Sequence, residues 1–267
     1  MTSVIVPLDG SPEAEAALPH ARALAGADPL LLLTSVWHGE PMAPRRYYDE
    51  RALVLAGTPV ETRIVVDERP SESILAYAAE RPDALVCMAT HGRNAIAQAV
   101  LGSTAEAVVR DAKGPILLVG PKATYDASRA EARNVVIAVD TPASAASLTP
   151  VAIAFADQHG LAPWGVQAIA PAPYPFVADA PIAQAAKDAG GVNEAVALMG
   201  QQGETIETKV LVATDPADAI IRFARELPAS FVIMGSHGRS GLARVALGSV
   251  SMRVVHRSPC PVLIVPQ

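Results

Sequence analysis

The feature that most constrains the fold is that the sequence repeats itself once. Four segments of the first half recur in the same order in the second half. They are residues 4–9 with 135–140, 89–93 with 235–239, 101–103 with 247–249, and 114–119 with 260–265. Because the period spans more than a hundred residues, the repeat indicates two complete domains of one fold rather than a solenoid of short units.

The spacing of the copies also predicts the domain boundaries. The offset is 131 residues for the first pair of segments and 146 for the other three, so the second half carries an insertion of 15 residues. We place it in the Pro- and Ala-rich stretch 171–190. Residues 121–131 are polar and have no apolar periodicity, which is typical of a connection. The sequence thus predicts domain 1 at 1–122, a linker at 123–132 and domain 2 at 133–267.

Within each half, apolar runs alternate with helical patterns. The continuous apolar run at 4–8 predicts a strand buried on both faces, and further strands are predicted at 30–37, 60–66, 84–89 and 116–119. Helices are predicted at 71–80, at 95–110, and from Ser11 onward, where a serine and a proline form a helix start. This alternation predicts a doubly wound, mainly parallel α/β sheet in each half.

Composition narrows the function classes. Hydrophobic residues make up 51% and charged residues 18%, and the net charge is −6. The balance favours a packed core, and the acidic charge argues against a nucleic-acid or anionic-membrane binder. No apolar run reaches the roughly 18 residues of a membrane span. We expect a cytoplasmic protein in which Cys87 and Cys260 serve packing.

The motif that carries chemistry lies between a strand and a helix of the second half. Gly235 and Gly238 allow a ligand to approach the backbone, whose N–H groups form an anion nest in such a turn. After nine further residues, Gly248 and Ser249 open a helix whose positive end favours phosphate. Ligands of open parallel sheets bind beyond the carboxyl ends of the strands, where these segments are expected. The pattern predicts a polyphosphate site.

The pattern Gly-x2-Gly-x9-Gly-Ser resembles the ATP-binding signature of the universal stress proteins, which place an Asp after the first strand beside the nucleotide. The second half fills the motif, and the first half fills it except that Ala89 replaces the first glycine. The nucleotide-binding residues that the resemblance implies are Asp9, Gly92, Gly102, Ser103, Thr104, Asp140, Gly235, Gly238, Arg239, Gly248, Ser249 and Val250.

The resemblance also implies a fold and an assembly. It implies two flavodoxin-like domains of the adenine nucleotide alpha hydrolase-like type, each with a five-stranded sheet. The domains of this family pair through their last strands, which here are Ile116–Val119 and Val262–Val265, so we expect a pseudo-dimer within one chain. The implied ligand is ATP, with Mg²⁺ as an optional companion. We expect the tandem chain to form a homodimer.

The two predicted sites depart from the family pattern in different places. Ala89 adds a methyl group where the family brings the backbone close to phosphate. In the second half, Asp140 is followed by Thr141 and Pro142 instead of the Gly-Ser that follows Asp9. We therefore favour phosphate binding in the second half over the first.

Several residues keep more than one interpretation. Asp9 and Asp140 contact a metal bound through the nucleotide, contact the ribose or base, or cap a loop. His91 and His237 are better explained as hydrogen-bonded turn residues than as catalytic bases, since no nucleophile stands in a recognisable arrangement with them. Arg239 either counters phosphate charge or is an ordinary surface arginine.

Three hypotheses for function remain. The first is an ATP-binding regulatory protein of a stress response, with no catalytic residues and at most slow ATP hydrolysis. The second is a degenerate interaction module that keeps the fold without the ligand, favoured by Ala89, Thr141 and Pro142. The third, an adenylyl-transferring enzyme or ATP pyrophosphatase, would need an acceptor-binding motif that the sequence does not display.

Overall fold

The computed structural model describes most of both halves of the chain. The described residues are 3–36, 47, 50–51, 55, 57–66, 69–91, 101–169, 206–236 and 247–267. The predicted insertion at 171–190 and the predicted site residues Gly92, Gly238 and Arg239 lie outside these residues. The remaining predicted site residues lie within them.

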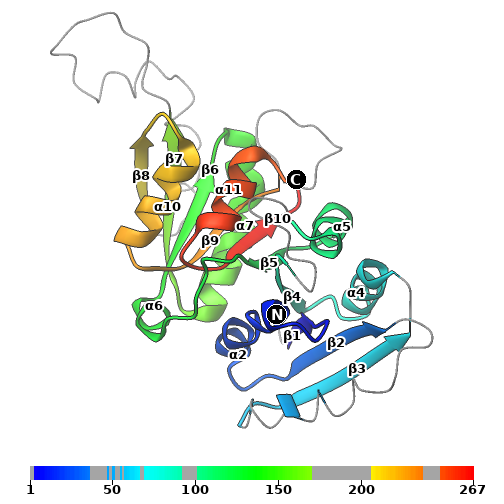
Figure 1. The fold of residues 1–267 in the computed structure, drawn as a ribbon. Helices are drawn as coiled ribbons and strands as arrows, with labels where there is room; N and C mark the ends of the chain where they lie inside the picture. Colours follow the sequence, from blue (N-terminus) through cyan, green and yellow to red (C-terminus); the bar gives the residue numbers. More distant parts are fainter. Residues whose placement is uncertain are drawn as a thin grey trace, which may run out of the picture.

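Ten strands of the described residues form one sheet in the order β3-β2-β1-β4-β5-β10-β9-β6-β7-β8 (Figure 1). The strands of the first half are β1 Ser3–Pro7, β2 Leu30–Val36, β3 Val60–Val66, β4 Ala84–Ala89 and β5 Ile116–Val119. Those of the second half are β6 Asn134–Val139, β7 Ala162–Ile169, β8 Glu207–Val212, β9 Ala229–Gly235 and β10 Val262–Val265. Counted outward from the centre of the sheet, the two halves therefore have equivalent strand orders, as the duplication requires.

The pairing within and between the halves confirms the predicted fold class. All strand pairs inside each half are parallel. The two halves meet through β5 and β10, which pair antiparallel with Val262 opposite Leu118 and Ile264 opposite Ile116. An antiparallel junction between equivalent strands is what a pseudo-twofold axis produces. The last strands thus form the junction that the family resemblance implied; we call it the seam.

Eight helices of the described residues cover the sheet. They are α1 Pro12–Glu15, α2 Leu18–Ala25, α4 Pro70–Ala79, α5 Ser103–Asp111, α6 Ala127–Ala132, α7 Pro142–His159, α10 Pro216–Glu226 and α11 Ser249–Arg257. Buried residues of α1, α2 and α7 pack in one apolar core, and those of α4, α5, α10 and α11 in a second. Because the sheet separates the two cores, each half is doubly wound as predicted.

Most strands follow apolar runs closely, since a strand buried on both faces must be apolar throughout. β3, β4, β5 and β10 have the predicted bounds. The extra length of the second half falls between β7 and β8, where 37 residues connect the strands against 23 between β2 and β3.

Two predicted helices differ from the structure. The helix predicted at 95–110 does not run through, because Leu101 and Gly102 are not helical and α5 begins at Ser103. The Gly102 N–H donates to the Thr90 carbonyl oxygen at 2.8 Å, which turns the chain just before the helix. The helix predicted from Ser11 begins there, with Ser11 Oγ accepting from the Ala14 N–H, but α1 ends at Glu15 and α2 starts at Leu18.

The predicted linker contains secondary structure and packs against the first half. Asp126 caps α6 by accepting from the Ser128 N–H at 2.9 Å. Upstream of this helix, Ala123 is buried, and its carbonyl oxygen lies 3.0 Å from His20 Nε2 of α2. The connection between the halves is therefore anchored to the fold. The boundaries at 122 and 133 remain our proposal.

A close backbone approach tightens the seam beyond the strand pairing. Gly120 follows β5 and lies against α11 of the second half. A Cβ atom added at Gly120 would lie 1.9 Å from the carbonyl oxygen of Val255 and 3.0 Å from its carbonyl carbon. Only glycine allows α11 to sit this close to the end of β5.

Substituting Gly120 with alanine should therefore destabilise the protein. The added methyl group must push α11 away from the seam, and overpacking of this kind costs about 1–3 kcal/mol. Gly114→Ala is the matched control, because a Cβ there meets nothing within 4 Å. Urea unfolding of both variants measures the difference. Equal free energies of unfolding for the two variants would contradict the close approach.

Candidate functional site at the carboxyl ends of the strands

Each half has one point where the strand order reverses. The chain passes from β1 to β2 on one side and later returns to β4 on the other side, so β1 and β4 flank the switch point of the first half. β6 and β9 flank that of the second half. Ligands of open α/β sheets bind in the crevice outside the carboxyl ends of the strands at such a point. The predicted site residues follow these four strands.

At the end of β1, hydrogen bonds hold the chain in a defined turn. The Leu8 N–H donates to the Leu33 carbonyl oxygen at 2.8 Å, and the Thr34 hydroxyl donates to the Leu8 carbonyl oxygen at 2.6 Å. Asp9 Oδ1 then accepts from both the N–H and the hydroxyl of Ser11, at 3.0 and 2.6 Å. Asp9 thus caps the loop, one of the interpretations left open, while it stands at the switch point.

Across the switch point, the residues after β4 lead to the start of α5. The Thr90 N–H donates to the Val119 carbonyl oxygen at 3.1 Å, which continues the strand pairing by one residue. The bond from the Gly102 N–H to the Thr90 carbonyl then sets the amino end of α5 directly over the end of β4. A Cβ at Gly102 would lie 3.2 Å from that carbonyl oxygen, so the glycine permits a tight approach.

The amino end of α5 carries no side-chain cap. Gly102 is the N-cap residue and has no side chain to accept from the first N–H groups of the helix. Ser103, the first helical residue, is exposed, and Thr104 is half-buried. Uncapped N–H groups at a helix start combine with the helix dipole to favour an anion.

The second half repeats this geometry. The Ser236 N–H donates to the Val265 carbonyl at 3.0 Å, and the Gly248 N–H donates to the Ser236 carbonyl at 2.8 Å. Gly248 is the N-cap of α11, again without a side-chain cap, and Ser249 is exposed. The equivalent hydrogen bonds have nearly the same lengths in the two halves. The same pair of backbone hydrogen bonds therefore positions the helix start in each half.

Two further residues complete the description of this helix start. Gly235 is buried at the end of β9, and its carbonyl oxygen accepts from the Ser251 hydroxyl of α11 at 2.9 Å. Val250 follows Ser249 and packs on the apolar core. The structure therefore brings Gly235, Gly248, Ser249 and Val250 together at one edge, as the motif predicted.

The end of β6 differs from that of β1, as the change after Asp140 suggested. Thr141 and Ser144 form a capping box, in which each side chain accepts from the backbone N–H of the other residue. The same Ser144 hydroxyl accepts from the Asp140 N–H at 3.1 Å. In the first half Gly10, at φ 84°, adds a left-handed residue before the helix. The second half has no such residue here, and its helix starts closer to the aspartate.

Gln167 on β7 contacts the backbone of the predicted site residue Asp140, a contact that the sequence did not reveal. It is 1% exposed, and its Nε2 donates to the Asp140 carbonyl oxygen at 3.1 Å. Its Oε1 is buried with no hydrogen-bond partner among the described residues. No sequence motif identifies Gln167, because it reaches Asp140 only through the pairing of β7 with β6.

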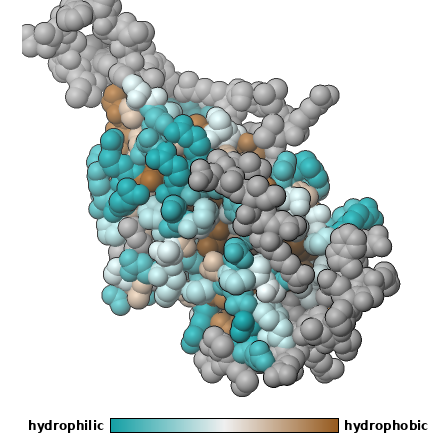
Figure 2. All heavy atoms as spheres, viewed as in Figure 1, coloured by the Kyte–Doolittle hydropathy of each residue, from teal (hydrophilic) through white to brown (hydrophobic). Residues whose placement is uncertain are grey.

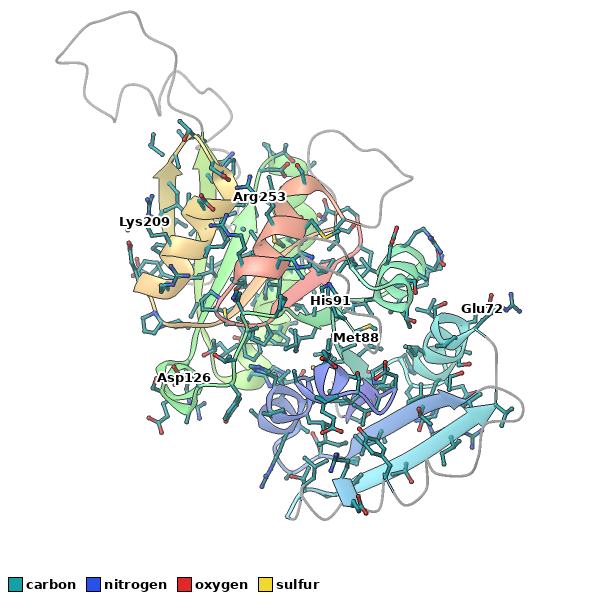
Figure 3. The ribbon with its side chains drawn as sticks, in the orientation of Figure 1. Glu72, Met88, His91, Asp126, Lys209 and Arg253 are labelled. Atoms are coloured by element: carbon teal, nitrogen blue, oxygen red, sulfur yellow. The ribbon has the colours of Figure 1, made fainter. Side chains whose placement is uncertain are left out.

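The seam also brings the two halves together at the edge of the first site. Because β5 and β10 are antiparallel, the carboxyl end of α11 lies beside the carboxyl ends of the first-half strands. There the ring of His256 lies 5.4 Å from the ring of His91, centroid to centroid. His91 Nδ1 lies 2.9 Å from the Thr90 hydroxyl, in keeping with the hydrogen-bonded turn role expected for it (Figure 3).

Ion pairs to the neighbouring helix fix the position of α11. Arg253 pairs with Asp215, which also caps α10, and Arg257 pairs with Asp218. The hydrogen bond from Arg253 lowers the pKa of the Asp215 carboxyl below its usual value. Figure 2 shows this face as largely hydrophilic where α10 and α11 lie. Helix α11, whose N-cap is Gly248, is thus held by its neighbour as well as by the seam.

Together these features define a class: a tandem pair of flavodoxin-like α/β domains with a glycine-capped helix start at each switch point. Comparison with known proteins identifies the family. The sequence model described as the Universal stress protein family matches residues 1–120 and 131–266. The chain belongs to the universal stress protein family.

Individual relatives agree with this assignment. A universal stress protein of Mycobacterium bovis is 31% identical over 191 residues, which cover 69% of this chain and 59% of that protein. The chain thus spans less than two thirds of the length of such relatives.

Solved structures resemble the whole chain. A universal stress protein from Archaeoglobus fulgidus has a TM-score of 0.64 at 18% identity, covering 99% of this chain and 98% of that one. A Pseudomonas aeruginosa protein of unknown function has a TM-score of 0.67 at 19% identity, covering 100% and 92%. At these identities the similarity shows the fold alone. In the described part of the chain, no helix has the length and apolar character needed to span a bilayer.

The pair of histidines at the seam predicts how stability depends on pH. Burial lowers the pKa of His256 below 6.5, and the neighbouring His91 lowers it further. Above pH 6.5 the ring is neutral in both the folded and unfolded states, so it has no effect. As pH falls through 6.5, the unfolded chain takes up a proton that the folded chain resists, and stability decreases.

His256→Gln should therefore make the loss of stability between pH 7 and pH 5 smaller than in the wild type. Urea unfolding at several pH values measures the slope of the unfolding free energy. The buried His20 and the half-buried His159, whose pKa values are also lowered by burial, keep a residual slope in the variant. An unchanged slope would show that His256 is protonated as readily in the folded state as in the unfolded state.

Proposed function

We propose that this universal stress protein binds an adenine nucleotide, with ATP as the candidate, at the carboxyl ends of its strands and acts as a regulator in a stress response. One observation carries the proposal. In both halves a glycine N–H donates at 2.8 Å to the loop after the fourth strand and leaves a helix start uncapped beside the switch point. The same arrangement occurs twice in a chain that carries the glycine pattern of the family twice.

The geometry suits a polyphosphate. The first N–H groups of α5 and α11 lack side-chain acceptors, and the positive end of each helix dipole favours negative charge. Ser103 and Ser249 are exposed at these starts and can donate hydroxyl hydrogen bonds to phosphate oxygens. Gly92, Gly238 and Arg239 are proposed to add backbone N–H groups and a positive charge.

The nucleoside end of each site is assigned to the aspartates. Asp9 and Asp140 follow the strands across the switch point from the helix starts. We propose that they contact the ribose or base, with Mg²⁺ bound through the phosphates as the alternative. No residue is assigned a catalytic role, and hydrolysis of bound ATP is expected to be slow.

The alternative function is a ligand-free interaction module, and two observations favour it. Ala89 stands at the end of β4 where Gly235 stands in the second half, so a methyl group points from the backbone near the first loop. In the second half, the capping box of Thr141 and Ser144 occupies the turn after Asp140. Each site departs from the family pattern at one end, which is why nucleotide binding must be tested site by site.

Ser103→Asp and Ser249→Asp test the proposal without weakening the fold. An acidic residue in the first turn of a helix stabilises the helix by about 0.3–1 kcal/mol, because it lies at the positive end of the dipole. The same charge repels phosphate. We expect ATP affinity at the altered site to fall at least tenfold, about 1.4 kcal/mol. Isothermal titration calorimetry gives the affinity and the number of sites for each single and double variant.

The matched control is Ser71→Asp, which adds the same charge to the first turn of α4. It should leave ATP binding unchanged. Gly238→Glu and Gly92→Glu extend the test to the glycine turns and should reduce affinity in the same way. If the double serine variant folds and binds ATP as tightly as the wild type, the phosphate assignment is wrong. Absence of binding by the wild type at millimolar ATP would favour the interaction module.

We also propose a homodimer of tandem chains in the cytoplasm. Within the described part of the chain, the edge strand β3 exposes two apolar side chains, Ile64 at 38% and Val66 at 53%, and exposed apolar side chains on an edge strand favour pairing with another copy. Light scattering of the purified protein at micromolar concentration should give about twice the monomer mass. A mass near 27.7 kDa would contradict the dimer.

A further inference from the structure

A cavity lies outside the predicted nucleotide sites, at the junction of the two halves and the linker. Its volume is about 140 Å³. The lining residues come from α2, from the linker, and from the segments that precede β6, β7, β9 and β10 or begin them. The cavity is thus near the amino ends of the second-half strands, and none of the predicted nucleotide-binding residues that the structure describes lines it.

Arg133 gives the cavity a positive charge. It is the residue after α6, with a left-handed backbone at φ 51° that is uncommon for a residue with a Cβ. Its guanidinium lies against Gly160, where an added Cβ would be 2.9 Å from Nη1. The described residues provide no hydrogen bond or ion pair to it. This left-handed residue ends α6, and its exposed guanidinium is available to a ligand in the cavity.

Two imidazoles line the same cavity. His159, at the end of α7, has its Nε2 buried with no hydrogen-bond partner among the described residues. His20 is oriented by the contact between its Nε2 and the Ala123 carbonyl and by an edge contact with the Tyr125 ring at 5.5 Å. Burial lowers the pKa of both histidines, so both are neutral near pH 7. The fixed cation of the cavity is therefore Arg133.

The rest of the lining is partly acidic and partly apolar. Asp126, labelled in Figure 3, also lines the cavity. Its Oδ1 already accepts from the N–H and the hydroxyl of Ser128, at 2.9 and 2.6 Å. Leu24, Leu161 and Phe231 supply apolar walls. An apolar cavity of similar size, about 150 Å³, holds one benzene ring. The space thus fits a small molecule with one ring or a short branched chain.

We propose that this cavity binds a small organic carboxylate, with its carboxylate on Arg133 and its apolar body against Leu24, Leu161 and Phe231. Arginine presents two parallel N–H donors that match a carboxylate. His159 completes the site with a hydrogen bond from Nε2, which gives that buried atom a partner. The inference does not rest on nucleotide binding, because the described lining of the cavity contains no residue of the predicted nucleotide sites.

Benzoate is the probe for the full-length protein, measured by isothermal titration calorimetry at pH 7. Benzamide has the same shape without the charge and should bind at least tenfold more weakly, about 1.4 kcal/mol. L-phenylalanine tests whether the carboxylate belongs to a free amino acid. Tighter binding than benzoate would assign the site to amino acids, and weaker binding would assign it to simple acids.

Arg133→Gln should reduce benzoate affinity at least tenfold, whereas Arg222→Gln, which removes an exposed arginine on α10, should not. Arg133→Gly guards against a folding artefact. Glycine adopts a positive φ without strain, so this variant should lose benzoate binding while its melting temperature is not below that of Arg133→Gln. Ala23→Phe should fill the cavity and abolish binding while leaving every charge in place.

Three results would overturn the proposal. The first is a wild-type protein that does not bind benzoate at millimolar concentration. The second is equal affinity for benzoate and benzamide. The third is an Arg133→Gln variant that binds benzoate as tightly as the wild type does.

Discussion

The antiparallel pairing of β5 with β10 is the interaction on which the rest of the structure depends. Each half alone would end in an exposed strand of four apolar residues, and both strands are fully buried once they pair. Unpaired apolar edges promote association with other chains, so the pairing stabilises the halves and protects them together. It also determines which elements meet: Gly120 with α11, and His91 with His256. The first site therefore borders the second half, although its helix start and aspartate come entirely from the first half.

Much of the fold could be predicted from the sequence because most of its strands are buried on both faces. Such strands must be continuous apolar runs, and the runs at β4, β5 and β10 gave the bounds without error. The bounds of β3 were also predicted, although this edge strand contains Glu61 and Arg63 and is largely exposed. The repeat gave further support, because matching segments in the two halves predicted the same elements. The start of α5 was predicted wrongly, because it depends on one backbone hydrogen bond from Gly102 to Thr90. Apolar periodicity carries no information about such a bond. The helix in the linker was not predicted either, because its N-cap residue, Asp126, cannot be distinguished by sequence from the other polar residues of a connection.

The candidate site was predictable only in part. Glycines and aspartates at fixed spacing from strands can be read along the chain, and Asp9, Gly102, Asp140, Gly235 and Gly248 all lie at the predicted edge. Gln167 and His256 could not be read in this way, because they reach the site through strand pairing and through the seam. Whether these residues hold a nucleotide stays a prediction. The geometry supports it most directly at the two uncapped helix starts, where equivalent hydrogen bonds recur.

Joining the two domains in one chain has a consequence for evolution. In a symmetric homodimer every substitution appears twice, so the two copies of a site must change together. Covalent linkage also gives each domain a high effective concentration of the other. The pair therefore stays together even when the protein is present at low concentration. Here each half has been free to diverge: alanine stands at the end of β4 and glycine at the end of β9, and Arg110 of α5 occupies the place that His256 occupies in α11. If both proposed sites bind nucleotide, this divergence gives them different affinities, and the two halves of one molecule then fill at different ligand concentrations.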